Sequence, residues 1–362
     1  MRIADRYVLK LFAGMFLGSL AAISFLFTVF SVLDSLSRLM GMEGASFTGI
    51  VRYYLLQLPQ TIFMTAPVAS LLSTMITLGL LNQRNELTAL RAAGVSLMRT
   101  TAPMVLAALA VSLGLFQLGN TLVPLGNRSL LSAKDIIQGE VTDPSRRVWY
   151  ASENPKRPPI FLRVEKVDRN TGTMRGLTVY ETSPDFSLRR QSTAKSAEWK
   201  KGEGLVMREV RVREFNGLSV PVLREENEVL LPITDKPADF LRAQRAPEEM
   251  DLEELNDQIV RVRRYGLQDT AYRVERQSRF AIPLSALILA LVGAPLAIRP
   301  ARSGGLAVGV LGAIVVGFVY FIIIAEFLSL GKGNLIPAWA AAWSANIVFG
   351  LIGAGWFLTL RR

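Results

Sequence analysis

The sequence contains no cysteine and no histidine among its 362 residues. Without cysteine the chain has no disulfide framework and no thiolate nucleophile. Without histidine it lacks the commonest metal ligand and the commonest general base, which argues against a metal-dependent enzyme or a catalytic triad. A Gly-x-x-x-x-Gly-Lys-Ser/Thr motif is also missing, so the chain cannot hold ATP in a P-loop. We expect no cofactor in this chain, and any ATP-driven function needs a partner.

Half of the residues are hydrophobic and 20% are charged. This mixture is too apolar for a typical soluble domain and too charged for a chain that lies wholly within a membrane, so it indicates two environments. The formal net charge is +11 at pH 7. Basic residues beside apolar spans usually follow the positive-inside rule or face anionic lipid, so we expect no nucleic-acid partner.

The first long apolar run covers residues 11–33 and follows Arg2, Arg6 and Lys10. It is long enough to cross a bilayer, which needs about 20 residues, and it exceeds the roughly 7 to 15 residues of a signal-peptide core. We therefore expect this run to be a retained transmembrane span. The five further runs of spanning length cover residues 53–81, 101–122, 280–298, 306–328 and 336–360. Pro124 is expected to end the third of these six spans.

Residues 125–247 have a different character from the spans around them. Short segments of alternating polarity are separated by turn residues such as those at 168–172. Val210 and Val212 alternate with charged neighbours, which is the pattern of a sheet with one wet face. Several strands at this spacing predict an all-β sandwich or jelly roll. The expected strands cover residues 160–167, 176–181, 188–199, 205–215 and 228–233.

Residues 248–279 are expected to connect the β domain to the fourth span. Asp251 and Glu254 have the spacing of a capping box in which Asp takes the place of Ser or Thr. Apolar residues then recur on one helical face up to Gly266, so we predict an amphipathic helix on or near the membrane. The four predicted parts of the chain are residues 1–124, 125–247, 248–279 and 280–362.

A short polar interruption at residues 82–95 separates the second and third spans. It has too few residues to fold as a domain, so it must lie on one membrane surface. Glu86, Leu87 and Leu90 recur at helical spacing, and Gly94 stands where a helix would end in a left-handed C-cap. The pattern predicts a small helix across a membrane face, whose role is contact. An ordinary connecting loop is the alternative that this stretch alone leaves open.

Asp34 and Arg38 stand one helical turn apart at the far end of the first span. Ionisable groups at that depth are costly unless they are paired or hydrated, so they suggest the polar mouth of a cavity. The alternative is plain capping of the span at the membrane interface.

The charge of the short loops predicts the orientation of the chain. By the positive-inside rule both termini and residues 82–95 are cytoplasmic, and residues 125–247 lie on the opposite side of the membrane. The basic residues that support this orientation are Arg2, Arg6, Lys10, Arg84, Arg91, Arg99, Arg299, Arg302, Arg361 and Arg362.

Several short motifs occur in order around the β domain. They are residues 79–87 (Gly-Leu-Leu-Asn-Gln-Arg-Asn-Glu-Leu), 92–94 (Ala-Ala-Gly), 272–279 (which begins Tyr-Arg-Val-Glu-Arg and ends with Arg279), 283–284 (Pro-Leu), 293–296 (Gly-Ala-Pro-Leu) and 302–304 (Arg-Ser-Gly). With the order of spans, they resemble the permease family of the bacterial lipopolysaccharide-export ABC transporter (LptF/LptG, also called YjgP/YjgQ) over essentially the whole chain. Residues 83–86 and 148–151 lean toward the G-type subunit. Residues 331–337 are also similar to F-type subunits, so that choice stays open.

The resemblance implies an α+β membrane protein with six transmembrane helices, three on each side of an inserted periplasmic β-jelly-roll domain. It implies a non-catalytic permease subunit in the bacterial inner membrane, with lipopolysaccharide as substrate. The implied partners are a cytoplasmic ATPase dimer (LptB-like) that carries ATP and magnesium and a second six-span permease (LptF or LptG). A single-span periplasmic bridge protein (LptC-like) and a periplasmic bridge protein (LptA-like) complete the set.

The resemblance also implies two sets of site residues. In this family the loop helix docks into the ATPase through a carboxylate at the Glu86 position, and basic residues near the end of the first helix face lipid phosphates. Arg38, next to Asp34, matches one such basic position, whereas a second position is Ser31 in this sequence. The expected ATPase-coupling residues are Arg84, Glu86, Leu87, Leu90, Arg91 and Gly94.

Two other functions remain as alternatives. An ion-driven secondary lipid transporter would usually need carboxylates near the middle of the membrane, and only Glu326 lies deep in a late span. A membrane-anchored periplasmic scaffold without a transport role would leave the Glu86 helix without a partner. Association with an ATPase and a second six-span permease would discriminate between these functions.

Overall fold

The computed structural model describes eleven stretches of the chain, which contain all the predicted site residues. They are residues 3–41, 46–137, 148–151, 160–167, 173–183, 187–200, 204–215, 222–231, 245–264, 268–298 and 305–359. Outside these stretches lie the turn expected at 168–172 and five arginines that were used to predict the orientation, namely Arg2, Arg299, Arg302, Arg361 and Arg362. The chain divides into two compact units, Met1–Gly139 with Pro247–Val260 and Gln268–Arg362, and Glu140–Ala246 with Arg261–Leu267. We call these the helical unit and the sheet unit.

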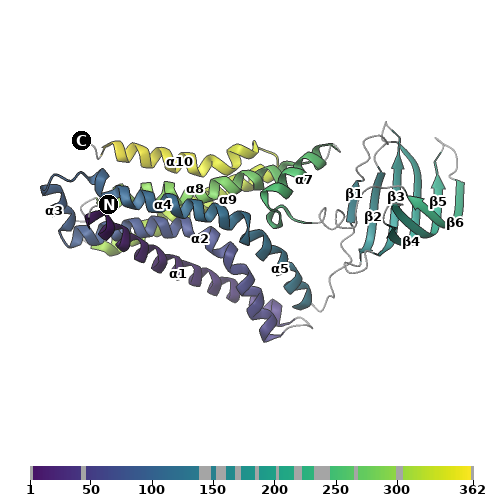
Figure 1. The fold of residues 1–362 in the computed structure, drawn as a ribbon, viewed down its shortest axis with the longest axis horizontal. Helices are drawn as coiled ribbons and strands as arrows, with labels where there is room; N and C mark the ends of the chain where they lie inside the picture. Colours follow the sequence, from purple (N-terminus) through teal and green to yellow (C-terminus); the bar gives the residue numbers. More distant parts are fainter. Residues whose placement is uncertain are drawn as a thin grey trace. The chain divides into compact units, whose positions relative to one another are not determined.

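The helical unit contains the six predicted spans. Six helical segments of the described chain are long and apolar enough to cross a membrane (Figure 1). The helices that form them are α1 (Ile3–Met40), α2 (Phe47–Gln83), α4 (Leu97–Asn120) continued by α5 (Leu122–Ile137), α8 (Thr270–Ile298), α9 (Gly305–Lys332) and α10 (Ala338–Thr359). A short helix, α3 (Glu86–Ala92), joins α2 to α4.

Three predicted boundaries differ from the structure. Pro124 was expected to end the third span, but α4 ends at Asn120 and Pro124 lies in the first turn of α5, where its missing N–H removes no helical hydrogen bond. The fourth span begins ten residues before the expected residue 280, because the polar stretch from Thr270 continues the same helix. The loop helix is shorter than residues 82–95, since Gln83 still belongs to α2.

Helix α2 is the centre of the helical unit. It packs against α1, α5, α8 and α9, and most of its residues from Thr61 to Leu81 are buried. Glycines let two neighbours come close. A Cβ atom on Gly317 of α9 would lie 2.7 Å from Cγ1 of Val68, and one on Gly293 of α8 would lie 3.1 Å from the carbonyl oxygen of Leu71. Such close backbone approach is typical of helices packed within a membrane.

The sheet unit contains one antiparallel sheet whose described strands follow their chain order. The strands are β1 (Val148–Ala151), β2 (Ile160–Val167), β3 (Met174–Thr182), β4 (Leu188–Lys200), β5 (Gly204–Glu214) and β6 (Val222–Leu231). The predicted α+β class, with six spans and an inserted β domain, is confirmed. The described strands form an up-and-down meander, whereas a Greek-key jelly roll also pairs strands that are distant in sequence. Hairpin signals in the sequence predict only that consecutive strands pair, so they cannot distinguish a meander from a jelly roll.

The alternation of the sheet slips by one residue at the same level in three neighbouring strands. Two consecutive residues that are not buried, 175–176 in β3, 195–196 in β4 and 208–209 in β5, stand between buried apolar residues. Gly176 and Glu209 have positive φ angles of 63° and 52°. The strands keep the same pairing register on both sides of the slip, so no strand carries an extra residue there, and the apolar side chains stay on one face. That face forms a buried core with residues of β2 and β6.

The predicted capping box is confirmed. Helix α7 (Leu252–Arg264) follows a single turn of 3₁₀ helix, η1 (Pro247–Glu249). The Asp251 carboxylate accepts a hydrogen bond from the N–H of Glu254 at 2.9 Å, and the Glu254 carboxylate accepts one from the N–H of Asp251 at 3.3 Å. Two N–H groups that have no partner within the helix are thereby satisfied, which fixes where α7 begins.

Candidate functional site

Helix α3 is fixed at both ends by special backbone geometry. Asn85, which precedes the helix, has a left-handed φ of 58°, and Gly94 has a φ of 80° as predicted for a C-cap. The N–H of Gly94 donates to the carbonyl of Arg91, and the N–H of Val95 donates to the carbonyl of Leu90, each at 3.0 Å. This pair of bonds is a Schellman motif. The seven-residue helix therefore has a defined orientation and is more than an irregular loop.

Leu87 anchors α3 to the transmembrane helices. Its side chain is 3% exposed and belongs to an apolar cluster to which α1, α2, α4 and α8 contribute. The other buried members are Val8, Phe12, Leu78, Leu81, Met104, Ala108, Ala290 and Ala294. Because Leu87 is enclosed, its side chain holds α3 in place and does not present a contact surface. A displacement of α3 would act on the four helices that meet around Leu87.

Glu86 lies at the surface, in the first turn of α3. One carboxylate oxygen accepts a hydrogen bond from the Tyr7 hydroxyl at 3.2 Å, and it is 4.0 Å from a guanidinium nitrogen of Arg84. The side chain remains 34% exposed. Leu90 is partly exposed and Arg91 is exposed on the same short helix. The arrangement presents a carboxylate that is held in position but still accessible.

Tyr7 was not predicted as part of this site. It belongs to α1 and is 79 residues away from Glu86 in sequence. The sequence signal was weak, because a tyrosine at the start of an apolar span is common at membrane interfaces. Its hydroxyl joins α3 to α1 in addition to the packing around Leu87.

Asp34 and Arg38 lie near the opposite end of α1. Arg38 comes 31 positions after Tyr7 on the same helix, so the two sites are roughly 45 Å apart at 1.5 Å per residue. Arg38 and Asp34 form an ion pair at 2.7 Å, and both side chains are largely exposed. An exposed pair of this type contributes little to stability, so the arginine is accessible to an anionic ligand.

The end of α1 that carries Arg38 has both polar contacts and an apolar cavity against α2. Ser31 donates to the side chain of Gln57 at 3.3 Å, and the hydroxyls of Ser35 and Tyr54 are 2.9 Å apart. Beside them, α1 and α2 enclose an open cavity of about 480 Å³. It is lined by Val32, Leu36, Met40, Ser46, Phe47, Ile50 and Tyr54. Arg38 stands two residues from Leu36 and Met40 along α1. An apolar cavity with a cation on the same helix suits a ligand with an anionic head and a hydrocarbon tail.

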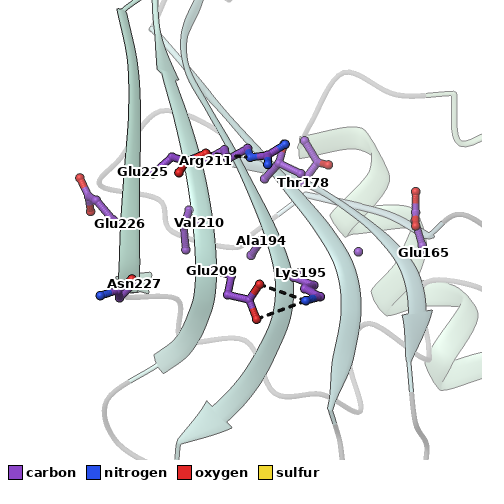
Figure 2. Close-up of a pocket in the computed structure, with 12 residues that line it drawn as sticks. Glu165, Thr178, Ala194, Lys195, Glu209, Val210, Arg211, Glu225, Glu226 and Asn227 are labelled. Carbon is purple, nitrogen blue, oxygen red and sulfur yellow. Dashed lines mark hydrogen bonds and ion pairs between the residues drawn. The ribbon is translucent and has the colours of Figure 1, made fainter.

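The sheet unit has a groove of about 570 Å³ on the charged face of its sheet (Figure 2). Figure 2 shows the side chains of Lys195 and Glu209 directed at one another across β4 and β5, at 3.1 Å. Arg211 pairs in the same way with Glu225. These exposed charges compensate one another, and the described residues contain no cluster of acidic side chains suited to a metal ion. The groove is lined mainly by exposed polar and charged side chains.

Comparison with known proteins extends over nearly the whole chain. The family described as "Lipopolysaccharide export system permease LptF/LptG" matches residues 6–361. Two similar proteins are the lipopolysaccharide export system permease proteins LptG of Escherichia coli strain K12 and of Escherichia coli O6:H1 strain CFT073. Each is 24% identical over 333 residues, which cover 89% of this chain and 88% of the relative. The chain therefore belongs to the LptF/LptG family of lipopolysaccharide export system permeases.

Proposed function

We propose that this permease is the LptG-type half of an ATP-driven transporter that extracts lipopolysaccharide from the inner membrane and passes it to a periplasmic bridge. The partners in this proposal are an ATPase dimer, an F-type permease and the single-span and periplasmic bridge proteins. The G-type assignment is supported by the two LptG relatives. Both termini and α3 face the cytoplasm in this proposal, and the sheet unit faces the periplasm, as the positive-inside rule predicts.

The observation that carries the proposal is the construction of α3. Glu86 is accessible at the surface, and the next residue, Leu87, is buried where α1, α2, α4 and α8 meet. A partner that binds the exposed side of α3 can therefore displace the helical unit through the buried side. The sequence has no P-loop, so in this proposal the energy is supplied by the partner.

Lipid extraction explains why such a partner is needed. Each CH₂ group of an acyl chain that passes from membrane to water costs about 0.8 kcal/mol. A permease must therefore shelter the chains and receive energy from outside. The cavity between α1 and α2 provides apolar walls, and Arg38 stands two residues from its lining residues Leu36 and Met40 on α1. We propose that Arg38 contacts a phosphate of the lipid while the cavity receives part of a chain.

An ion-driven carrier is disfavoured by the placement of Glu326. Intramembrane carboxylates of carriers face the bundle interior or a water-filled cavity. Glu326 is exposed on α9 and does not point into the interior of the helical unit. A passive scaffold is disfavoured because α3 ends in a Schellman motif and is anchored by a buried leucine, which a simple connection does not require.

The test replaces Glu86 in the complex reconstituted in lipid vesicles with its ATPase and second permease. Truncating a carboxylate paired across a partly desolvated interface costs about 2 to 5 kcal/mol, so Glu86→Ala should weaken assembly or uncouple ATP hydrolysis from lipid release. Glu86→Lys adds repulsion and should be worse. Glu226→Lys, on the exposed surface of the sheet unit, is the matched control and should release lipid normally.

Photocrosslinking to lipopolysaccharide separates substrate binding from coupling in the same vesicles. Arg38→Glu should lower crosslinking while the complex still assembles, whereas the Glu86 variants should crosslink normally wherever they assemble. Wild-type coupling of ATP hydrolysis to lipid release in Glu86→Lys would show that α3 is only a connector and would refute the proposed function.

A further inference from the structure

Arg279 is a buried cation that holds three separate chain segments together. It lies in α8 and is 3% exposed. Its guanidinium donates to the carbonyl of Gly119 at the end of α4, to the carbonyl of Glu248 at 3.1 Å and to the carbonyl of Met250 at 3.3 Å. It also forms an ion pair at 2.9 Å with Glu275, one turn earlier on α8. Five donors in a rigid fork suit an arginine to this divergent set of acceptors.

Two of these carbonyls belong to the stretch that follows the sheet unit in the chain. We call residues 247–254, which contain η1 and the start of α7, the return segment. Further side chains hold it. Arg128 donates to the carbonyl of Glu249 at 2.7 Å and binds the Glu254 carboxylate, and Lys332 binds the Glu248 carboxylate at 2.7 Å. The return segment is thus fastened from α5, α8 and α9.

Making this connection with a buried arginine costs free energy. Burying a cation costs several kcal/mol unless its partners compensate, and apolar packing of similar volume is often as stable or more stable. What the guanidinium adds is a fixed relation between the return segment, the end of α4 and α8. An apolar side chain of the same size could fill the space but could not hold three carbonyls at one geometry.

The other end of α8 reaches the cluster that anchors α3. Ala290 and Ala294 of α8 pack in the same buried cluster as Leu87. Arg279 and Ala294 are 15 residues apart on one helix, which is roughly 22 Å at 1.5 Å per residue. Helix α8 therefore packs against Leu87 of α3 near its C-terminal end, and Arg279 in its N-terminal half binds the return segment.

We propose that Arg279 is a positioning residue that locks the return segment to α8, so that displacement of α3 is transmitted along α8 to the chain that leaves the sheet unit. The inference rests on the proposed function, because it takes α3 to be the element that the ATPase moves. Arg279 itself contacts neither nucleotide nor lipid in this mechanism. Its loss should therefore separate lipid release from ATP hydrolysis and from lipid binding.

The test compares Arg279→Met and Arg279→Lys with wild type in the full complex in vesicles. Lysine keeps the charge beside Glu275 but cannot reach three divergent carbonyls, so it preserves folding better than methionine. We expect the rate of ATP-dependent lipid release to fall about tenfold in both variants, a size typical of coupling carried by a buried network. ATP hydrolysis and lipid photocrosslinking should stay at wild-type levels. Arg273→Met is the matched control, since Arg273 of α8 pairs with Asp269 at the start of the same helix.

A spin-label distance tests directly whether Arg279 holds the return segment in place. The chain has no cysteine, so Glu253→Cys on α7 and Trp339→Cys on α10 carry the only spin labels on this subunit. Both positions are exposed, and α10 packs on α8. The distance between the labels should stay single and narrow in wild type with and without ATP, and should broaden in Arg279→Lys.

Two results would overturn the inference. One is a wild-type rate of lipid release in Arg279→Lys, whatever the label distances. The other is a loss of ATP hydrolysis or of photocrosslinking in proportion to release, which would mean general destabilisation. If the wild-type complex itself showed no ATP-dependent lipid release, the proposed function would fail before Arg279 entered the comparison.

Discussion

The two units of the chain arrange polar and apolar side chains in opposite ways. In the described part of the sheet unit nearly all enclosed side chains are apolar, such as Leu162 and Leu177, and the outward ones include paired charges such as Lys195 and Glu209. In the helical unit the large outward side chains are apolar, and many enclosed side chains are polar. Its outward residues include Leu17, Phe25, Phe30, Phe318 and Leu351, and its enclosed ones include Thr65, Ser70, Thr74, Thr77 and Ser285.

This inversion shows that different forces hold the two units together. Water surrounds the sheet unit in the proposed topology, so removal of apolar surface from water is its main source of stability. The helical unit is surrounded by lipid tails, which are as apolar as leucine, so close packing and internal hydrogen bonds take the larger share. Substitutions of the same kind should therefore have different effects in the two units.

The largest effect is expected in the core of the sheet unit. Leu177 is fully buried in the apolar core of the sheet. Leu177→Ala should lower the free energy of unfolding of this unit by about 2 to 5 kcal/mol, because methyl groups are lost and a cavity remains. Trp199 packs against the same core, and its fluorescence follows denaturant unfolding in a background where the other four tryptophans are replaced by phenylalanine.

The control for this prediction is Leu223→Ala, because Leu223 is exposed on β6. Its unfolding midpoint should stay close to wild type. Equal losses from Leu177→Ala and Leu223→Ala would contradict the assignment of a single buried face to the sheet.

A smaller effect is expected from a buried polar group in the helical unit. Asn346 of α10 donates to the carbonyl of Ala281 at 2.6 Å and accepts from the Tyr320 hydroxyl at 3.0 Å. Hydrogen bonds between membrane helices contribute about 0.6 kcal/mol on average and at most about 1.7 kcal/mol. Asn346→Leu should therefore reduce stability by about 1 to 2 kcal/mol in SDS-driven unfolding from mixed micelles.

Two further variants show whether the hydrogen bond is responsible. Tyr320→Phe removes the same bond from its other side, so the double variant with Asn346→Leu should lose less than the sum of the two single losses. Ile347→Ala, at the exposed neighbouring position, should change stability less than Asn346→Leu. Additive losses in the double variant would refute the coupling between Asn346 and Tyr320.

The sequence predicts most of what local pattern controls. The apolar runs locate the spans, alternation locates β2 to β5 within a few residues, and the capping box at Asp251 fixes the start of α7. Gly94 was identified because few residues other than glycine adopt its φ angle. Each of these signals lies within a stretch of a few neighbouring residues.

The sequence does not predict contacts between distant segments. Helical spacing placed Leu87 on α3 but could not show that it faces inward, since the cluster around it comes from four other helices. Arg279 was part of a recognised motif, yet its acceptors are 29, 31 and 160 residues away. The one-residue shift in alternation lies at the same level in β3, β4 and β5, and this alignment depends on the pairing register, which alternation within one strand cannot fix.

The smallest effect is expected where the helical unit most resembles the surface of the sheet unit. Glu248 and Lys332 form an ion pair at 2.7 Å with both side chains 43% exposed. Burial alone would raise the pKa of the Glu248 carboxyl, but the hydrogen bond from Lys332 and the nearby positive charges lower this pKa overall. A lowered pKa in the folded state means that the pair stabilises the protein above the ordinary carboxyl pKa of about 4.5. That contribution is lost as the pH falls through the lowered value.

For so exposed a pair the contribution at neutral pH should be about 0.2 to 1 kcal/mol, and salt should reduce it further. The measurement compares unfolding of wild type and Lys332→Gln at pH 7 and at a pH below the Glu248 pKa. The variant should be less stable at pH 7, and the difference should shrink at low pH. Lys195→Gln, which breaks the exposed pair with Glu209 in the sheet unit, should lose a similar amount at neutral pH. A loss of several kcal/mol in Lys332→Gln alone would show that the Glu248 pair belongs energetically to the buried network around Arg279, and the comparison between the two surfaces would no longer hold.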